Sequence, residues 1–214
     1  MARIILFGGH GRVALLTEPL LVARRDSFTA VVRNPDHIDK VWEIGADAVV
    51  ADIEQLDVDA LTKLVADHDA VVWSAGAGGG NPARTLAVDQ DAAIRTMRAA
   101  EQAGVRRYVM VSYFDSSTEH GVDPSNPFFA YAEAKAAADA RLRESRLDWT
   151  ILGPSALTFE AGTGHIDTRA TKSTQVSRQN VALTIAATLA DDTTIGSTIN
   201  FNDGETPIGE AIRS

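Results

Sequence analysis

A short glycine pattern near the amino terminus constrains the fold more than any other feature of the sequence. Ile4 to Phe7 is an unbroken run of aliphatic and aromatic residues, which is typical of a strand buried on both faces of a parallel sheet. The pattern Gly8-x-x-Gly11-x-x-Ala14 follows at once and leads into an apolar stretch that predicts a helix. A strand, a glycine turn and a helix in this order favour a nucleotide-binding α/β fold.

The three small residues of this pattern suit a site for the pyrophosphate of a dinucleotide. Gly8 permits the tight turn, Gly11 lets the backbone approach the phosphates, and Ala14 keeps the helix close to the sheet. The start of the helix then directs free N–H groups and a partial positive charge at the phosphates. Glycine-rich turns that bind nothing are also common, so the interpretation depends on the position of this turn between a strand and a helix.

The composition is that of an ordinary soluble protein and excludes several classes of site. With 214 residues, 45% hydrophobic and 23% charged, we expect residues 1–214 to form one dinucleotide-binding domain. The absence of cysteine excludes disulfides, thiolate metal sites and a cysteine nucleophile. The five histidines show no ligand spacing, so no metal site is expected.

The charge and the apolar runs bear on partners and location. A net charge of −9 disfavours binding to nucleic acid or anionic lipid, which both require a basic surface. No leader pattern precedes the first strand, and no apolar run reaches the length of a membrane span. We therefore expect a cytoplasmic protein, either a monomer or a homodimer, whose partner is a small-molecule substrate.

Strands and helices alternate along most of the chain. Short connections between them predict right-handed βαβ units in one parallel sheet with helices on both faces, a Rossmann-type doubly wound α/β fold. We expect strands at residues 4–7, 28–33, 45–51, 69–74, 105–112 and 149–152, and a late strand at 198–201. We expect helices at residues 12–24, 35–43, 56–66, 82–103, 128–146, 181–189 and 207–212.

Two positions add detail to this pattern. Pro19 lies inside the first expected helix, where it removes a backbone hydrogen bond and clashes with the preceding turn, so we expect a kink or an early break. Ser177 precedes an apolar-periodic segment, with Asn180 three residues on, which is typical of a helix N-cap. We expect Ser177 and its neighbour Arg178 to be structural.

Arg33 bears on the choice between NAD and NADP. It ends the second expected strand, where a site that prefers NAD would place an acidic residue for the ribose 2′-hydroxyl. An arginine there can pair with a 2′-phosphate, and Arg12 beside the glycine turn could assist it. Arg33 could also be a solvated residue at a strand end. We expect NADP(H) to be preferred over NAD(H).

The ends of the third and fourth strands supply further candidate cofactor contacts. Asp52 and Ile53 could border an adenine ring, although Asp52 could equally cap the segment that follows. The small residues at 75–77 would let the backbone lie against a ribose or a nicotinamide, or they form a merely flexible loop. The candidate cofactor-binding residues are Gly8, His10, Gly11, Arg12, Val13, Arg33, Asp52, Ile53, Ala75, Gly76 and Ala77.

Tyr131 and Lys135 are the candidate acid–base pair. They are four residues apart in an alanine-rich helical stretch, so they lie on one helical face. A lysine ammonium beside a phenol favours the phenolate and would lower the tyrosine pKa toward a value useful for proton transfer. Tyr-x-x-x-Lys is an abundant chance pattern, and it gains meaning from its position behind a dinucleotide-binding half. The long polar segment before it, residues 113–127, predicts a lid or a binding loop.

Together these motifs resemble atypical short-chain dehydrogenases/reductases, of the NAD(P)H-binding, NmrA-like and sugar-epimerase-related kind. The resemblance covers essentially the whole chain. It is carried by Gly8 to Ala14, Arg33, Asp52-Ile53, Ala75 to Ala77, Tyr131, Lys135 and residues 147–157, 162–164, 176–182 and 204–208.

The resemblance implies roles for three residues and shows two departures. It implies that Tyr131 exchanges a proton with the substrate oxygen, that Lys135 binds the nicotinamide ribose and tunes the tyrosine, and that Ser112 polarises the same oxygen. Two aromatic residues follow Ser112 where the family often has a second serine, so the hydroxyl could instead come from Ser116 or be absent. Gly153 stands where relatives commonly carry an arginine before the proline.

The sequence as a whole predicts an NADP(H)-dependent oxidoreductase that passes hydride to or from a small carbonyl, alcohol or quinone-like compound. The substrate would lie against a small C-terminal extension, between segments at about 113–128 and 154–176. Two alternatives remain. One is a non-catalytic NADP(H)-binding redox sensor. The other is a sugar-nucleotide epimerase or dehydratase, although such enzymes usually carry a longer C-terminal substrate domain.

Overall fold

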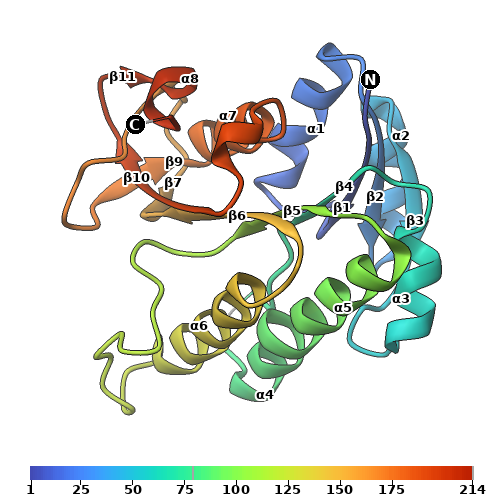
Figure 1. Ribbon diagram of the computed structural model, residues 1–214, viewed down its shortest axis with the longest axis horizontal. Coiled ribbons are helices and arrows are strands. Elements are labelled where there is room, and N and C mark those ends of the chain that lie inside the picture. The colour runs from blue at the N-terminus through green and yellow to red at the C-terminus, as the bar shows by residue number, and fades with distance from the viewer. Residues whose placement is uncertain (79, 214) are drawn as a thin grey trace.

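A nine-stranded sheet forms the centre of the computed structural model, which describes residues 1–78 and 80–213 (Figure 1). The strand order is β11-β8-β10-β6-β5-β4-β1-β2-β3. The strands from β3 to β10 in that order pair in parallel, and β8 is antiparallel to both of its neighbours. The bounds are β1 Arg3–Phe7, β2 Ser27–Val32, β3 Asp47–Val50, β4 Ala70–Trp73, β5 Arg107–Val111, β6 Asp148–Pro154, β8 His165–Asp167, β10 Ser197–Asp203 and β11 Thr206–Pro207.

Helices cover both faces of this sheet, which confirms the predicted doubly wound fold. In Figure 1, α1 and α7 lie over one face, and α3, α5 and α6 lie over the other. No helix within the described residues is long and apolar enough to cross a membrane. The helix bounds are α1 Ala14–Ala23, α2 Ile38–Ile44, α3 Val58–Val65, α4 Pro82–Thr85, α5 Ala93–Ala103, α6 Phe129–Arg143, α7 Arg178–Thr188 and α8 Ile208–Ala211.

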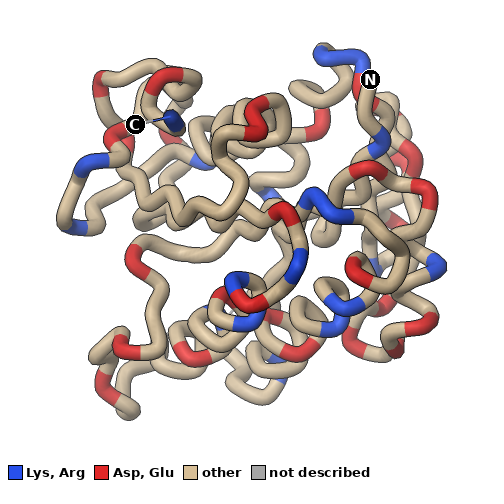
Figure 2. The backbone as a smooth tube through the Cα atoms, in the orientation of Figure 1, with Lys and Arg blue, Asp and Glu red and all other residues tan. Residues whose placement is uncertain are grey.

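Alternate residues of each central strand supply two separate cores. In β1, Ile4 and Leu6 pack into the core shared with α1 and α7, and Ile5 and Phe7 pack into the core shared with α3, α5 and α6. All four side chains are fully buried. A strand buried on both faces explains the unbroken apolar run in the sequence. Charged residues lie mainly on the helices and loops around the sheet (Figure 2).

The helix predicted at residues 82–103 is continuous but not uniform. α4 passes into a π-helical segment, Leu86–Ala92, which passes into α5. Gly104 ends α5 with a φ of +74°, a backbone conformation that glycine adopts without a steric penalty. A π-helical turn inside a longer helix is often found at a functional site.

The expected early break at Pro19 is wrong, because α1 runs on to Ala23 with Pro19 inside it. Pro19 is exposed, so water can bond the carbonyl that loses its N–H partner. The expected N-cap is confirmed, since the Ser177 hydroxyl accepts a hydrogen bond from the Asn180 N–H at 3.0 Å. Helix α7 begins at Arg178, three residues earlier than the apolar pattern indicates.

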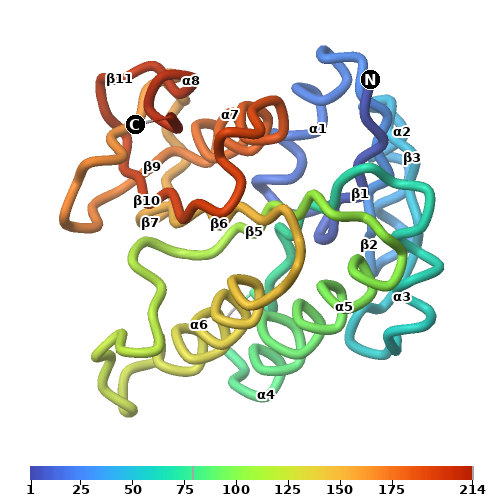
Figure 3. Tube along the Cα trace, in the orientation of Figure 1, coloured from blue at the N-terminus to red at the C-terminus, as the bar shows by residue number. Residues whose placement is uncertain are grey.

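The C-terminal third adds short strands that the sequence does not predict. β7 (Ala156–Thr158) and β9 (Gln175–Ser177) pair in parallel as a separate two-stranded sheet. β8 and β11, also absent from the prediction, extend the main sheet at its edge. Figure 3 shows that this late part of the chain returns to the amino-terminal half, where α7 packs against α1.

Glu18 is an acidic residue buried inside this packing. Its side chain in α1 is fully buried, and neither carboxylate oxygen has a hydrogen-bond partner among the described residues. Burial disfavours the charged form and raises the pKa of Glu18 from its ordinary value of 4.5 to about 8. The folded protein therefore holds a proton on Glu18 at neutral pH.

We expect the substitution Glu18→Gln to change the pH dependence of stability. Between pH 4.5 and about 8 the unfolded chain loses this proton while the folded protein keeps it, so the free energy of unfolding of the wild type falls as pH rises through this window. The slope is at most about 1.4 kcal/mol for each pH unit. Glu18→Gln should remove the slope, so the variant should exceed the wild type in stability most at pH 8 and above.

Urea denaturation at pH 5, 7 and 9 measures this difference. The exposed Glu144 gives a matched control, because Glu144→Gln changes the same chemistry without burial. A wild-type stability that falls no more steeply than that of Glu18→Gln over this range would contradict the assignment.

Candidate functional site

Two adjoining cavities lie at the carboxyl ends of the parallel strands. The larger has a volume of about 760 Å³ and is bordered by the segments after β4, β5 and β6. The smaller, of about 390 Å³, is bordered by the segments after β1, β2 and β3. Both are lined by Gly11, Ser74, Ala75, Gly76 and Gly78. In open α/β sheets this edge is where ligands bind.

The glycine turn after β1 makes the close approach between these segments possible. Gly8 has a φ of +85°, and a Cβ there would lie 2.7 Å from the backbone N and Cα of Ala75. A Cβ on Gly11 would lie 2.9 Å from the carbonyl oxygen of Gly8. The sequence interpretation missed Gly9, whose Cβ would lie 2.6 Å from the Cβ of Ala30. All three glycines are therefore required by close contact, and Gly8 also by its positive φ.

The start of α1 has backbone donors available beside this turn. Within the described chain, the N–H groups of Arg12 and Val13 have no hydrogen-bond partner. Both residues line the larger cavity. These donors, together with the helix dipole, favour an anionic group at this point.

The smaller cavity is lined by Arg33, Asp52, Ile53 and His10, which the sequence predicts to bind the cofactor. Arg33 Nη1 lies 3.2 Å from Oε1 of Glu54, and the same oxygen accepts a hydrogen bond from Arg84 Nε at 3.0 Å. Glu54 was missed from the sequence. It holds both arginine side chains at the rim of the cavity.

The capping role considered for Asp52 is confirmed. Its Oδ1 accepts a hydrogen bond from the Glu54 N–H at 3.1 Å, which caps the turn that follows. Asp52 also lines the smaller cavity. The His10 ring stacks on the His37 ring, with 3.4 Å between centroids and 14° between planes. Burial and the nearby His37 and Lys40 lower the pKa of His10, which favours its neutral ring.

The small residues after β4 are fixed in place by hydrogen bonds. The Ala77 N–H donates to Oδ2 of Asp89 at 3.0 Å, and Arg84 Nη1 donates to the Ala77 carbonyl at 3.1 Å. Ala75, Gly76 and Ala77 line the larger cavity. Residues 75–77 therefore form a fixed wall of the cavity, whereas the sequence also allowed a flexible loop.

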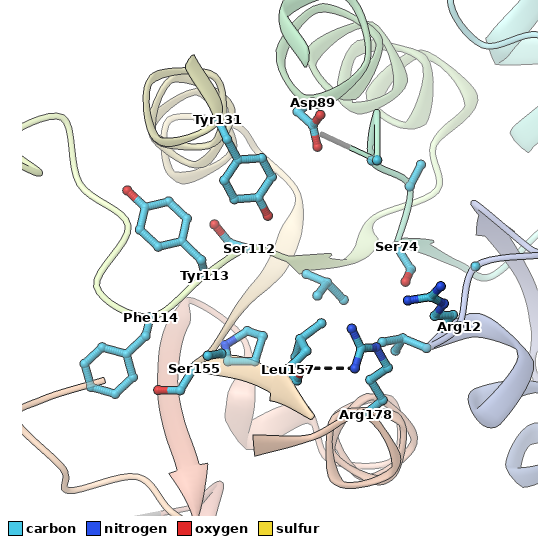
Figure 4. Close-up of a pocket in the computed structure, with 18 of the residues that line it drawn as sticks. Arg12, Ser74, Asp89, Ser112, Tyr113, Phe114, Tyr131, Ser155, Leu157 and Arg178 are labelled. Carbon is cyan, nitrogen blue, oxygen red and sulfur yellow. Dashed lines mark hydrogen bonds between the residues drawn. The ribbon is translucent and has the colours of Figure 1, made fainter. Parts of the chain in front are cut away.

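Asp89 is a site residue that the sequence interpretation missed. It lies in the π-helical segment, is 2% exposed and lines the larger cavity (Figure 4). Burial raises its pKa, while Lys135, the Ala77 N–H and Arg84 act in the opposite direction. The available signal was an acidic residue between the apolar positions Val88 and Ala92, which both turn out to be buried.

One face of α6 carries Tyr131, Lys135 and Asp139, which are spaced by four residues. The structure places these three side chains in different surroundings. Tyr131 and Ser112 both line the larger cavity, with their hydroxyl groups on the same side of it (Figure 4). Asp139 is fully buried and accepts a hydrogen bond from the Ser112 hydroxyl at 2.5 Å. Ser116, the alternative source of a hydroxyl, does not line the cavity.

Lys135 lies behind this wall, away from the cavity. It is 1% exposed, does not line the cavity, and its Nζ donates to the Val111 carbonyl at 2.7 Å. Burial lowers the pKa of Lys135, while the carboxylates of Asp139 and Asp89 act in the opposite direction. The structure thus brings Tyr131 and Ser112 to the cavity, and places Lys135 against strand β5.

The expected lowering of the Tyr131 pKa by Lys135 is wrong for this arrangement. The pKa of Tyr131 is raised, chiefly by burial and further by the carboxylates of Asp89 and Asp139 and by Tyr113. Burial in a low-dielectric wall disfavours the phenolate, and nearby negative charge adds to that effect. The phenol of Tyr131 therefore stays protonated at neutral pH.

Aromatic rings form the outer wall of the larger cavity. Tyr113, Phe128 and Tyr131 contact one another, with ring centroids 5.2 to 5.8 Å apart. Phe114 and Leu157 also line this part. The segments 113–128 and 154–176 both supply lining residues, as expected, and the wall they form is largely uncharged.

The structure gives a physical reason for the glycine at position 153. A Cβ there would lie 2.1 Å from Oδ1 of Asn200 and 3.0 Å from the carbonyl oxygen of Tyr113. Asn200 is paired with Gly153 in the register of β10 and β6, and its Oδ1 accepts a hydrogen bond from the Asp115 N–H at 3.1 Å. Asn200 thus occupies the space that a side chain at 153 would need.

We expect Gly153→Ala to lower stability by about 1–3 kcal/mol, the usual cost of forcing extra atoms into a packed site. The double variant Gly153→Ala with Asn200→Ala should recover most of the loss, because it removes the atom that the new Cβ meets. Thermal unfolding of the wild type, both single variants and the double variant measures the coupling. Equal losses for Gly153→Ala with and without Asn200 would show that the two side chains do not compete for this space.

Among the described residues, no group of three or more His, Asp or Glu side chains could hold a metal ion.

Comparisons with known proteins agree with this geometry. Residues 8–192 match the model of an NAD(P)H-binding family. The chain is 34% identical over 223 residues to the UPF0659 protein YMR090W of Saccharomyces cerevisiae, which covers 99% of this chain and 98% of the relative.

Two solved structures share the fold throughout. A putative NAD-dependent epimerase/dehydratase from Bacillus halodurans has a TM-score of 0.90 and 33% identity, and 99% of each chain is covered. The oxidoreductase ylbE from Lactococcus lactis has a TM-score of 0.89 and 31% identity, covering 98% of this chain and 94% of that one. The chain therefore belongs to the NAD(P)H-binding family, in the atypical, NmrA-like group of short-chain dehydrogenases/reductases.

Proposed function

We propose that the protein is an NADP(H)-dependent oxidoreductase that transfers hydride between the cofactor and a small carbonyl, alcohol or quinone-like compound. The observation that carries the proposal is the position of the Tyr131 and Ser112 hydroxyls in a cavity that continues into the cavity beside the glycine turn. A proton donor and a dinucleotide site then border one continuous space.

The residues present suit a dinucleotide along the whole edge of the sheet. The pyrophosphate would lie at the glycine turn, where a Cβ would meet backbone atoms and where the Arg12 and Val13 N–H groups are available. The adenine would lie in the smaller cavity beside Asp52 and Ile53. The ribose next to the nicotinamide would lie along residues 75–77.

Arg33 would bind a 2′-phosphate. The side chain is 56% exposed at the rim of the smaller cavity, where a 2′-phosphate would displace its ion pair with Glu54. A phosphate can take a bidentate pair of hydrogen bonds from a guanidinium group. This pairing supports the proposed preference for NADP(H).

Tyr131 would act as the proton donor in reduction. When bound, the reduced nicotinamide supplies the hydride, which is chemistry that belongs to the cofactor. The raised pKa of Tyr131 keeps its phenol protonated, so it can give a proton to the substrate oxygen as negative charge develops there. Its hydroxyl faces the cavity, where a substrate oxygen can reach it.

Ser112 and Lys135 would support Tyr131 in ways that differ from the family expectation. The Ser112 hydroxyl gives its hydrogen to Asp139, so its lone pairs would accept a hydrogen bond from Tyr131 or from a substrate hydroxyl. Lys135 would act at a distance, through its positive charge. Its ammonium would have to leave the Val111 carbonyl to contact a ribose. Both residues would then orient the site more than react in it.

The lining of the larger cavity favours an uncharged substrate over a sugar nucleotide. Among the residues described there, the cations are Arg12 and Arg178, and both lie beside the glycine turn. A nucleotide-sugar substrate brings a second diphosphate, which needs cations of its own. The aromatic wall at Tyr113, Phe114 and Phe128 suits a planar or apolar compound.

One observation favours a second candidate, a redox sensor that binds NADP(H) without turnover. Lys135 does not line the cavity and its ammonium is held by a backbone carbonyl, so the pair of the family motif is not assembled at the cavity wall. Calorimetric titration with NADPH and NADH, followed by a panel of carbonyls and quinones monitored through loss of NADPH absorbance, separates the candidates. Oxidation of NADPH by a panel member supports the oxidoreductase, whereas tight binding with no turnover supports the sensor.

We expect Arg33→Ala to weaken NADPH binding by about 10- to 100-fold and to leave NADH binding nearly unchanged, because only NADPH carries the 2′-phosphate. Titration of both cofactors against the variant measures this. Arg98→Ala is the control, since Arg98 lines a separate cavity at residues 98–106 and 146–147. Equal loss of both cofactors would contradict the assignment of Arg33.

We expect Tyr131→Phe to reduce turnover by at least about 100-fold while NADPH affinity stays within a factor of about two, since the hydroxyl serves the proton step. Tyr113→Phe is the matched control, because it removes a neighbouring phenol from the same wall. Steady-state rates together with NADPH titration separate chemistry from binding. Turnover that survives in Tyr131→Phe would remove this residue from the mechanism.

A further inference from the structure

An exposed phenylalanine joins two arginines that are distant in the sequence. Phe159, in the loop after β7, is 75% exposed. The guanidinium carbon of Arg178 lies 4.2 Å from its ring centroid, and that of Arg12 lies 5.0 Å from it. Arg12 belongs to the glycine turn and Arg178 begins α7, so this contact connects the first and last thirds of the chain. Figure 4 shows the two guanidinium groups side by side near Ser74.

These two cations lie together without an acidic partner. Neither Arg12 nor Arg178 forms an ion pair within the described residues, although the chain has 29 acidic residues against 20 Lys and Arg. Burial and the charge of Arg12 both lower the pKa of Arg178, as expected for like charges in proximity. Two adjacent cations of this kind are stabilised by an anion placed between them.

Only part of the Arg178 guanidinium group is hydrogen-bonded within the described residues. Its Nη1 donates to the carbonyls of Leu157 at 3.0 Å and Thr158 at 2.9 Å. Within the described chain, Nε and Nη2 make no hydrogen bond, and the residue lines the larger cavity next to Arg12. A guanidinium group held on one side and free on the other is prepared for a phosphate oxygen.

We propose that Arg178 is a second pyrophosphate-binding residue, acting with Arg12 across the cofactor, and that it couples cofactor binding to the substrate wall. This inference rests on the proposed function, because it assumes a dinucleotide at the glycine turn. It departs from the sequence interpretation, in which Arg178 is structural.

The coupling follows from what Arg178 holds. The Leu157 and Thr158 carbonyls belong to β7, and Ala156 and Leu157 line the same cavity as Tyr113 and Phe114. An Arg178 fixed by a phosphate fixes β7 as well, so the cofactor completes the wall against which the substrate lies.

Titration of Arg178→Gln with a set of fragments tests the pyrophosphate contact. We expect NADPH, NADH and ADP to bind about 10- to 100-fold more weakly than to the wild type, since each carries a diphosphate. Adenosine 2′-monophosphate, which lacks a diphosphate, should bind within a factor of about two of the wild type. This pattern differs from that of Arg33→Ala, which affects only ligands with a 2′-phosphate.

Two further variants serve as controls for this test. Arg169→Gln changes an exposed arginine of the same C-terminal segment and should leave all four ligands unchanged. Arg178→Lys keeps the charge and loses the fork, so it should fall between the wild type and Arg178→Gln, and it carries the test where Arg178→Gln fails to fold. Circular dichroism and thermal unfolding establish which variants are folded.

The outcomes separate this inference from the function on which it rests. If the wild type binds neither NADPH nor NADH, the proposed function fails. If the wild type binds NADPH and folded Arg178 variants bind NADPH, NADH and ADP as the wild type does, the second phosphate contact is wrong while the proposed function stands. Loss of all ligands equally in a folded variant, adenosine 2′-monophosphate included, also overturns the contact.

Discussion

The close approach of two backbone turns is the constraint on which the rest of the site depends. Gly8 after β1 and Ala75 after β4 come so near that a single Cβ atom at Gly8 would lie 2.7 Å from backbone atoms. The two cavities share lining residues at this point, so they adjoin along one edge of the sheet. The parallel pairing of β1 with β4 fixes the approach, and both cores hold that pairing from the two faces of the sheet.

The site also contains charged side chains that are buried in the protein interior. Lys135, Asp89 and Asp139 are each almost or fully buried around Tyr131 and Ser112. A buried charge is costly unless it is paired or hydrogen-bonded, and each of these has at least one partner: the Val111 carbonyl, the Ala77 N–H and the Ser112 hydroxyl. The ammonium lies among the carboxylates, which act against the effect of burial on its pKa. Burial is the main cause of the raised pKa of Tyr131, and the carboxylates of Asp89 and Asp139 add to it, while Lys135 does not line the cavity.

The fold could be predicted from the sequence because its central strands are local signals. Runs such as residues 4–7 and 70–73 are apolar on both faces, and the helices between them end at clear signals such as Gly104. The strands β7, β8, β9 and β11 could not be predicted, because two or three residues carry no periodicity and their pairing partners lie far along the chain. The site was predictable where it depends on turn chemistry, as at Gly8 and Gly11. The site was not predictable where a side chain bonds to a partner distant in the sequence. Examples are the bonds of Lys135 to the Val111 carbonyl and of Ser112 to Asp139.

The pairing of Gly153 with Asn200 ties two neighbouring strands to one loop. Asn200 fills the space over the glycine and at the same time holds the Asp115 backbone at the start of the long loop before α6. A side chain at 153 and the side chain at 200 therefore exclude each other. A change at 153 that displaces Asn200 also releases the tether of that loop, so the two positions act as one unit in any redesign of this part of the site.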